Sequence, residues 1–218
     1  MSEKKGGLAG NSGNSSFRSF RGMLKLGVIM ALYAAAACVG LAFVYAGTGK
    51  VIAQRQQTDL EAALTELFND ADEFKVISGL NSPDPAVIIE EDGAFVALKN
   101  GIPIGVALRT SRASYNGAIK VLAGVGADSK ISGVKILEHS DTPGLGANAA
   151  SATYYVDRAR GIHFYDQFAG KSVSDPFVPK QDVIAITAAT ITSRAVAASV
   201  KAAGEAASAW LGSQGGLR

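Results

Sequence analysis

The hydrophobic pattern divides the chain into one long apolar segment near the N-terminus and a longer part with mixed periodicities. Residues 26–46 read LGVIMALYAAAACVGLAFVYA and hold no charged residue. At about 1.5 Å rise per residue, this segment spans roughly 30 Å, the thickness of the hydrocarbon core of a bilayer. A buried helix of a soluble protein normally keeps one polar face, and this segment has none. The pattern therefore predicts a single transmembrane helix over residues 23–49.

A cleaved signal peptide is the alternative interpretation of this segment. Its apolar region would be about 7–15 residues long and would end at a small-residue cleavage site. The run from Ala34 to Ala37 supplies small residues, but apolar sequence continues to Tyr45. We therefore expect an uncleaved anchor, preceded by a disordered cytoplasmic tail over the Gly- and Ser-rich residues 1–22.

Basic residues flank the apolar segment unevenly. Five basic residues and one acid give residues 1–25 a charge of +4, so the remainder carries −2 of the formal +2. The positive-inside rule then leaves the N-terminus in the cytoplasm and the C-terminal domain outside. A mildly acidic domain excludes nucleic acid as a partner, because that function needs a basic face. The basic residues before the helix are Lys4, Lys5, Arg18, Arg21 and Lys25, and those just after it are Lys50 and Arg55.

Beyond the anchor, the pattern predicts an α+β domain with a mostly antiparallel sheet and flanking helices. Residues 50–80 read as a stalk helix and a connection, and the domain occupies residues 81–218. Residues 95–98 and 104–108 form a candidate hairpin around Asn100-Gly101, a pair suited to the positive φ values of a tight turn. Further strands are expected at residues 118–122 and 134–137. A last helix is expected from Ser193, as its cap, to about Leu211.

Two segments could carry chemistry. The loop EHSDTPGLG, residues 138–146, follows a strand, and its proline and glycines make a rigid loop whose backbone can approach a flat ligand. A plain turn is the alternative. The segment ITAATITSR, residues 186–194, leads into the last helix, where free amides, the helix dipole and Arg194 would favour a phosphate. Its alternative is an ordinary capped helix start.

Other site chemistry is missing from the sequence. His139 and His163 are the only histidines and stand in different segments, so neither a catalytic triad nor a metal site is expected. The one cysteine, Cys38, lies in the apolar segment and cannot form a disulfide within the chain. There is no GxGxxG fingerprint or Walker loop.

The two segments together resemble the FMN-binding domain of the G subunit of the Rnf electron-transport complex. The related C subunit of the sodium-pumping NADH:quinone reductase is similar too. The His-x-x-Thr-Pro-Gly-Leu-Gly loop and its order before the threonine segment make the resemblance specific. With the anchor included, it extends from about Leu26 to Leu211. It is carried by residues 115–122, 133–146, 164–171 and 187–196.

The resemblance implies a covalent flavin. Members of this family carry FMN through a phosphoester to a threonine hydroxyl, attached by a separate flavin transferase from FAD, and the acceptor of their motif falls on Thr190. The 142–146 loop would then lie near the flavin ring and tune its potential. The residues expected to contact FMN are His139, Thr142, Pro143, Gly144, Leu145 and Gly146 in the loop, and Thr187, Ala188, Ala189, Thr190, Thr192, Ser193 and Arg194 in the threonine segment.

The chain departs from the family motif at two positions. Ala188 stands where the family usually has glycine, and Ile184 stands where it usually has aspartate, with Asp182 two residues too early. If the glycine provides a positive φ or close approach of the transferase, Ala188 would hinder attachment.

The resemblance therefore implies an electron relay without an active site of its own. The chain would be a single-pass member of an Rnf-type ion-translocating ferredoxin:NAD oxidoreductase in the cytoplasmic (inner) membrane, with its FMN domain on the outer or periplasmic side. Its partners would be the other membrane and peripheral subunits. Three alternatives remain: the corresponding quinone reductase subunit, a structural subunit that has lost its flavin, and a free-standing anchored flavoprotein.

Overall fold

The computed structural model describes residues 13–215, and the chain divides into two units at residue 56. Helix α1 (Gly13–Leu67) crosses this division. Within the described residues, its part from Gly22 to Leu67 is the one helix long and apolar enough to cross a membrane. Its large apolar side chains from Met23 to Ile52 are exposed, as those of a lipid-facing helix would be. The expected apolar helix is therefore confirmed, and it continues without a break into the expected stalk.

The expected disordered tail differs from the structure in part. Residues 13–22 belong to α1, whereas residues 1–12 lie outside the described residues. A helix that is already nucleated extends at little cost through residues that are weak helix formers by themselves.

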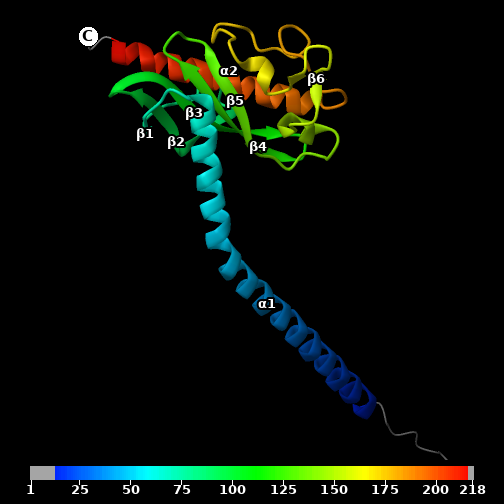
Figure 1. Cartoon of the computed structure of the whole chain (residues 1–218). Coiled ribbons are helices and arrows are strands. Elements are labelled where there is room, and N and C mark those ends of the chain that lie inside the picture. Colours follow the sequence, from blue (N-terminus) through cyan, green and yellow to red (C-terminus); the bar gives the residue numbers. More distant parts are fainter. Residues whose placement is uncertain (1–12, 216–218) are drawn as a thin grey trace, which may run out of the picture. The chain divides into compact units, whose positions relative to one another are not determined.

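The second unit is built on a five-stranded antiparallel sheet whose strands follow one another in chain order (Figure 1). The four strands expected from the sequence are confirmed, although each is longer than its apolar core. A fifth strand lies in the range 50–80, so the sheet begins before the expected boundary at residue 81. The strands are β1 (Glu73–Ile77), β2 (Val87–Lys99), β3 (Ile102–Ser114), β4 (Gly117–Gly126) and β5 (Ile131–Glu138).

The turn between β2 and β3 follows the sequence prediction. Asn100 and Gly101 have φ values of 53° and 79°, the two positive values that a tight hairpin turn requires. The register Lys99↔Ile102 closes the hairpin directly on these two residues.

Both faces of the sheet are buried over residues 93–98 of β2, 105–108 of β3 and 121–125 of β4, which explains why these runs hold no polar side chain. Along β2, Ala94, Val96 and Leu98 point to one core and Phe95 and Ala97 to the other. The first core is covered by helix α2 (Thr190–Gly215), which lies along the sheet in Figure 1. The second is covered by the last turns of α1 and by Phe68.

Glycine allows Phe68 to approach the sheet. A Cβ atom on Gly105 would collide with the Phe68 ring, and one on Gly124 would lie 3.1 Å from it. The end of α1 is therefore fitted to the domain by shape as well as by apolar area.

Between β5 and α2 the chain makes a long excursion with little regular structure. It contains the 3-10 helices η1 (Gly146–Ala150) and η2 (Asp166–Phe168) and the short hairpin of β6 (Tyr155–Asp157) and β7 (Ile162–His163). Phe164 and Phe168 are fully buried and fix this excursion to the first core. It ends at Thr190, the first residue of α2.

Candidate functional site

The two segments singled out in the sequence meet at the start of α2. Asp141, in the loop after β5, accepts a 2.7 Å hydrogen bond from the Thr192 hydroxyl in the first turn of α2. Gly146 lies against this junction, and a Cβ atom there would stand 2.6 Å from Thr192 Oγ1. The absence of a side chain at residue 146 thus permits the close approach of the two segments.

A pocket of about 550 Å³ opens between these segments, and we call it the loop–helix pocket. Its volume lies within the range of cofactor sites, and its rim is apolar. Tyr115, Ile191 and Leu145 are 69%, 53% and 42% exposed there. The pocket is lined by Tyr115, Asp141, Thr142, Leu145, Gly146, Ala188, Ala189, Thr190, Ile191 and Thr192.

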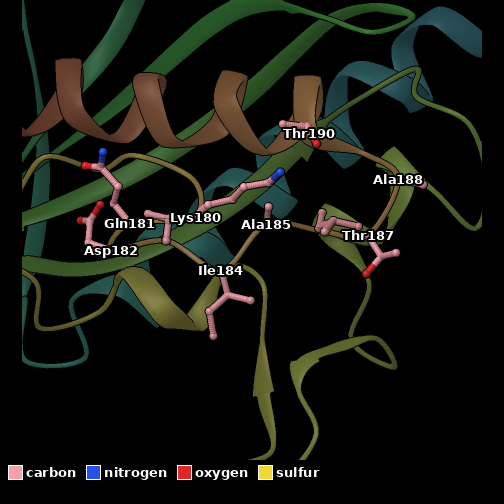
Figure 2. Close-up of a pocket in the computed structure, with 10 residues that line it drawn as sticks. Lys180, Gln181, Asp182, Ile184, Ala185, Thr187, Ala188 and Thr190 are labelled. Carbon is pink, nitrogen blue, oxygen red and sulfur yellow. The ribbon is translucent and has the colours of Figure 1, made fainter.

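A second pocket of about 540 Å³ is formed by residues 180–190, and we call it the 180–190 pocket. In Figure 2, the Lys180 side chain extends from this segment toward the start of α2, where Thr190 lies. Thr190 and Ala188 line both pockets.

Thr190 combines an accessible hydroxyl with free backbone donors. It is the first residue of α2 and is half-buried. The first backbone bond of the helix joins Ser193 N to Ala189 O, and no acceptor within residues 13–215 is recorded for the amides of residues 190–192. Ala189 has no side chain that could cap them. These amides and the helix dipole favour an anion beside the Thr190 hydroxyl.

Ala188 adopts a conformation that favours glycine. Its φ is 59°, in the left-handed region. This conformation costs a residue with a Cβ about 1 kcal/mol relative to glycine. Ala188 thus keeps the turn before Thr190 at some cost in stability.

The segment leading to this turn is held by side chains outside the two motifs. Gln167 clamps the backbone of Ile184: its Oε1 accepts from Ile184 N at 2.7 Å and its Nε2 donates to Ile184 O at 3.1 Å. Asp182 accepts from the amides of Phe177 and Val178 at 3.0 and 2.6 Å. Burial alone would raise the pKa of Asp182, but these hydrogen bonds and Lys171 lower it. The carboxylate of Asp182 therefore bonds within its own loop. The Ile184 side chain is exposed.

Comparisons with known proteins bear on the same residues. The FMN-binding domain family matches residues 114–205, and the RnfG N-terminal region matches residues 18–67. The chain is 31% identical over 196 residues to the G subunit of the Na(+)-translocating ferredoxin:NAD(+) oxidoreductase complex of Acetobacterium woodii, covering 82% of this chain and 88% of that one. It is 33% identical over 177 residues to the G subunit of the proton-translocating ferredoxin:NAD(+) oxidoreductase complex of Clostridium ljungdahlii (79% and 84%). It is 32% identical over 190 residues to the G subunit of the ion-translocating oxidoreductase complex of Vibrio atlanticus (82% and 87%).

The chain belongs to the RnfG family. The resemblance read from the two motifs is therefore confirmed, and the second unit contains an FMN-binding domain. The region matched to that domain, residues 114–205, includes both segments that line the loop–helix pocket.

Seven of the thirteen residues expected to contact FMN in this RnfG domain line the loop–helix pocket, and Thr187 lines the 180–190 pocket only. The other five line neither. The seven are Thr142, Leu145, Gly146, Ala188, Ala189, Thr190 and Thr192; the five are His139, Pro143, Gly144, Ser193 and Arg194.

Ser193 and Arg194 differ most from their expected roles. Ser193 is fully buried and is not the helix cap: its hydroxyl accepts from Ile186 N and donates to Ala189 O, both at 3.0 Å. The helix therefore starts at Thr190, three residues before the expected cap. Arg194 lines a separate pocket that also contains Phe177 and Lys201.

Several residues that line the two pockets were not among those expected from the sequence. Tyr115 and Ile191 give the RnfG pocket its apolar rim, Lys180 gives the 180–190 pocket a cation, and Asp141 gives the loop–helix pocket a buried carboxylate. Asp141 and Ile191 stood inside the two singled-out segments, but the sequence holds no signal that pairs Asp141 with Thr192, 51 residues away.

Proposed function

We propose that this chain carries FMN covalently on Thr190 and relays electrons as the G subunit of an Rnf-type ion-translocating ferredoxin:NAD oxidoreductase. The observation that carries the proposal is the position of Thr190. Its hydroxyl stands at the free N-terminus of α2 and on the wall of a pocket that unites both family motifs.

The residues present fit this cofactor. The amides of residues 190–192 would face the phosphate, and Lys180 would add a positive charge. Tyr115, Leu145 and Ile191 offer apolar surface to a flat ring system. When bound, FMN supplies one- and two-electron redox chemistry, and the chain contributes attachment, orientation and the electrostatic surroundings.

Attachment would need access to the 184–190 segment by a separate flavin transferase. The Thr190 oxygen would form the phosphoester to the FMN part of FAD as the pyrophosphate bond breaks, and AMP and the hydroxyl proton would be released. The side chains of Ile184, Thr187 and Ala188 are exposed, so a second protein can reach them. The backbone at Ala188 already has a positive φ despite the missing glycine. This supports attachment with the altered motif.

The orientation of the chain in the membrane is part of the same proposal. The excess of basic residues before the apolar part of α1 supports an N-terminus in the cytoplasm and an FMN domain outside. The other subunits of the complex would then hold the electron donor and acceptor. Relatives named as ferredoxin:NAD(+) oxidoreductase subunits favour this assignment over the quinone reductase.

The test uses protein from its native membranes, where the matching transferase is present. We expect a denatured gel band that fluoresces under ultraviolet light and a Thr190 peptide heavier by the mass of FMN less one water. The Thr190→Val variant should lose the fluorescence and the electron transfer but still assemble with its partners. A dark wild-type band, or a Thr190→Val complex with full electron transfer, would favour the flavin-free structural subunit instead.

A further inference from the structure

Asp141 is the single side chain lining the loop–helix pocket that carries a charge at neutral pH. The other lining residues are apolar, hydroxyl-bearing or glycine. Asp141 is only 5% exposed, so water screens its charge poorly.

Hydrogen bonds keep this carboxylate charged in its buried position. Its Oδ2 accepts from Ser114 Oγ at 2.6 Å and from Thr192 Oγ1 at 2.7 Å, and its Oδ1 accepts from Asn116 N at 3.0 Å. Burial alone would raise the pKa of Asp141, but these three donors, with a smaller contribution from His139, lower it below the ordinary value. Asp141 is therefore ionised at every physiological pH.

At pH 8, where histidine side chains are ordinarily neutral, no full positive charge within residues 13–215 pairs with that negative charge. Among the ion pairs of residues 13–215, none involves Asp141. Its three donors are neutral groups that stabilise the carboxylate but leave the wall of the pocket with one net negative charge.

We propose that the buried carboxylate of Asp141 sets the reduction potential of the flavin, making it more negative than the same pocket would with a neutral residue. This inference rests on the proposed function, because it requires FMN at the loop–helix pocket. Asp141 acts on the potential through its charge, in addition to joining the two segments of the pocket.

The sign follows from the charge balance of reduction. Uptake of two electrons and one proton leaves one additional negative charge on the flavin (FMN + 2e⁻ + H⁺ → FMNH⁻), with a carrier of the complex as electron donor. A like charge in poorly screened surroundings disfavours that state. The donor must then be a stronger reductant than it would need to be with a neutral residue at position 141.

The Asp141→Asn variant removes the charge and leaves the contacts. The amide oxygen can still accept from Asn116 N, and the amide nitrogen can donate to the hydroxyls of Ser114 and Thr192, which can rotate to accept. Thr192→Val is the structural control, because it breaks the bond between the segments and keeps the charge. Glu91→Gln is the charge control, because Glu91 is exposed and does not line the pocket.

The measurement is a spectroelectrochemical titration of the full chain in detergent at pH 8, where histidine side chains are ordinarily neutral. An electrode supplies the electrons, and flavin absorbance reports the loaded molecules only, so partial loading is sufficient. At the wild-type midpoint, the reduced-to-oxidised ratio should rise about tenfold in Asp141→Asn. It should stay within about twofold in Glu91→Gln, and it should rise less in Thr192→Val than in Asp141→Asn, because Thr192→Val leaves the pocket charge in place.

Each outcome bears on a different part of the proposal. A wild-type protein without flavin from native membranes would contradict the proposed function. An Asp141→Asn protein that carries flavin and has an unchanged reduced-to-oxidised ratio would overturn the effect of Asp141 on the potential and would leave the proposed function standing. An equal rise in Thr192→Val, or an Asp141→Asn protein that takes up no flavin even from FAD and transferase in vitro, would make Asp141 a structural residue and would also overturn it.

Discussion

The Thr192 hydroxyl donates a 2.7 Å hydrogen bond to Asp141 Oδ2 and thereby joins the loop after β5 to the first turn of α2. Both side chains are buried, at 1% and 5% exposed. Because the loop–helix pocket is formed by these two segments, its shape depends on this contact.

Gly146→Ala should separate the two segments. The added Cβ would lie 2.6 Å from Thr192 Oγ1 and 2.7 Å from Asp141 Cβ, so both must move. We expect a loss of about 1–3 kcal/mol in the free energy of unfolding, which is typical of overpacking a buried site. Denaturation in detergent, followed by the fluorescence of the single tryptophan, Trp210, measures the loss. Gly212→Ala is the control. No atom lies within 4 Å of the Cβ position of Gly212, and alanine stabilises a helix relative to glycine. Equal stability of the two variants would contradict the close approach at Gly146.

Ala188→Gly should stabilise the protein. The φ of 59° costs nothing for glycine, and the gain of about 1 kcal/mol is partly offset by the greater freedom of glycine in the unfolded chain. We also expect faster attachment of FMN, because the variant restores the family motif. Unfolding and intact mass after a limited reaction with transferase measure the two effects. Ala185→Gly is the matched control: Ala185 has no positive φ, so glycine there should destabilise slightly. If both variants lose stability, the left-handed turn at Ala188 is wrong.

The sheet could be predicted because its signals are local. The Asn100-Gly101 turn and the apolar runs beside it determine a hairpin without reference to the rest of the chain. β1 was missed because Glu73 and Lys75 interrupt a short edge strand, which reads as part of the connection from the stalk.

The candidate site was harder to predict because its important contacts are long-range. Thr190 was found through a motif, but the helix start depends on the bond between Ser193 and Ile186, seven residues apart and outside any capping pattern. Sequence spacing also could not show that Arg194 lines a different pocket from Thr190, while Lys180 lines the same one.

The stability of the domain should depend on pH through Asp141. Its hydrogen bonds lower its pKa in the folded state below the ordinary value of 3.8, so the unfolded chain binds the proton more readily. The stabilisation is complete well above 3.8 and is lost as the pH falls through the lower, folded value. The drop in unfolding free energy from pH 6 to pH 3 should therefore be largest in wild type, smaller in Thr192→Val and smallest in Asp141→Asn. The reverse order would mean that burial, not hydrogen bonding, determines the pKa of Asp141.

Lys180, rather than Arg194, should assist the phosphate at Thr190. Lys180 shares a pocket with Thr190, whereas Arg194 lines the pocket beside Phe177. We expect Lys180→Ala to slow attachment of FMN about two- to fivefold, the effect of one exposed charge near a helix terminus. Arg194→Ala should leave the rate within error. The rate is followed by intact mass with purified transferase and FAD. The opposite ranking would return Arg194 to the role expected from its sequence position.

The orientation of the chain can be tested with its single cysteine removed. In a Cys38→Ser background, Ala209→Cys places a thiol on an exposed position of α2, and Ser2→Cys places one at the N-terminus. If the basic residues before the anchor hold the N-terminus inside, a membrane-impermeant maleimide should label Ala209→Cys in intact spheroplasts and Ser2→Cys only after lysis. If Ser2→Cys were labelled in intact spheroplasts and Ala209→Cys were not, the topology would be the opposite of the one proposed. The FMN domain would then face the cytoplasm, where soluble electron carriers could reach it directly.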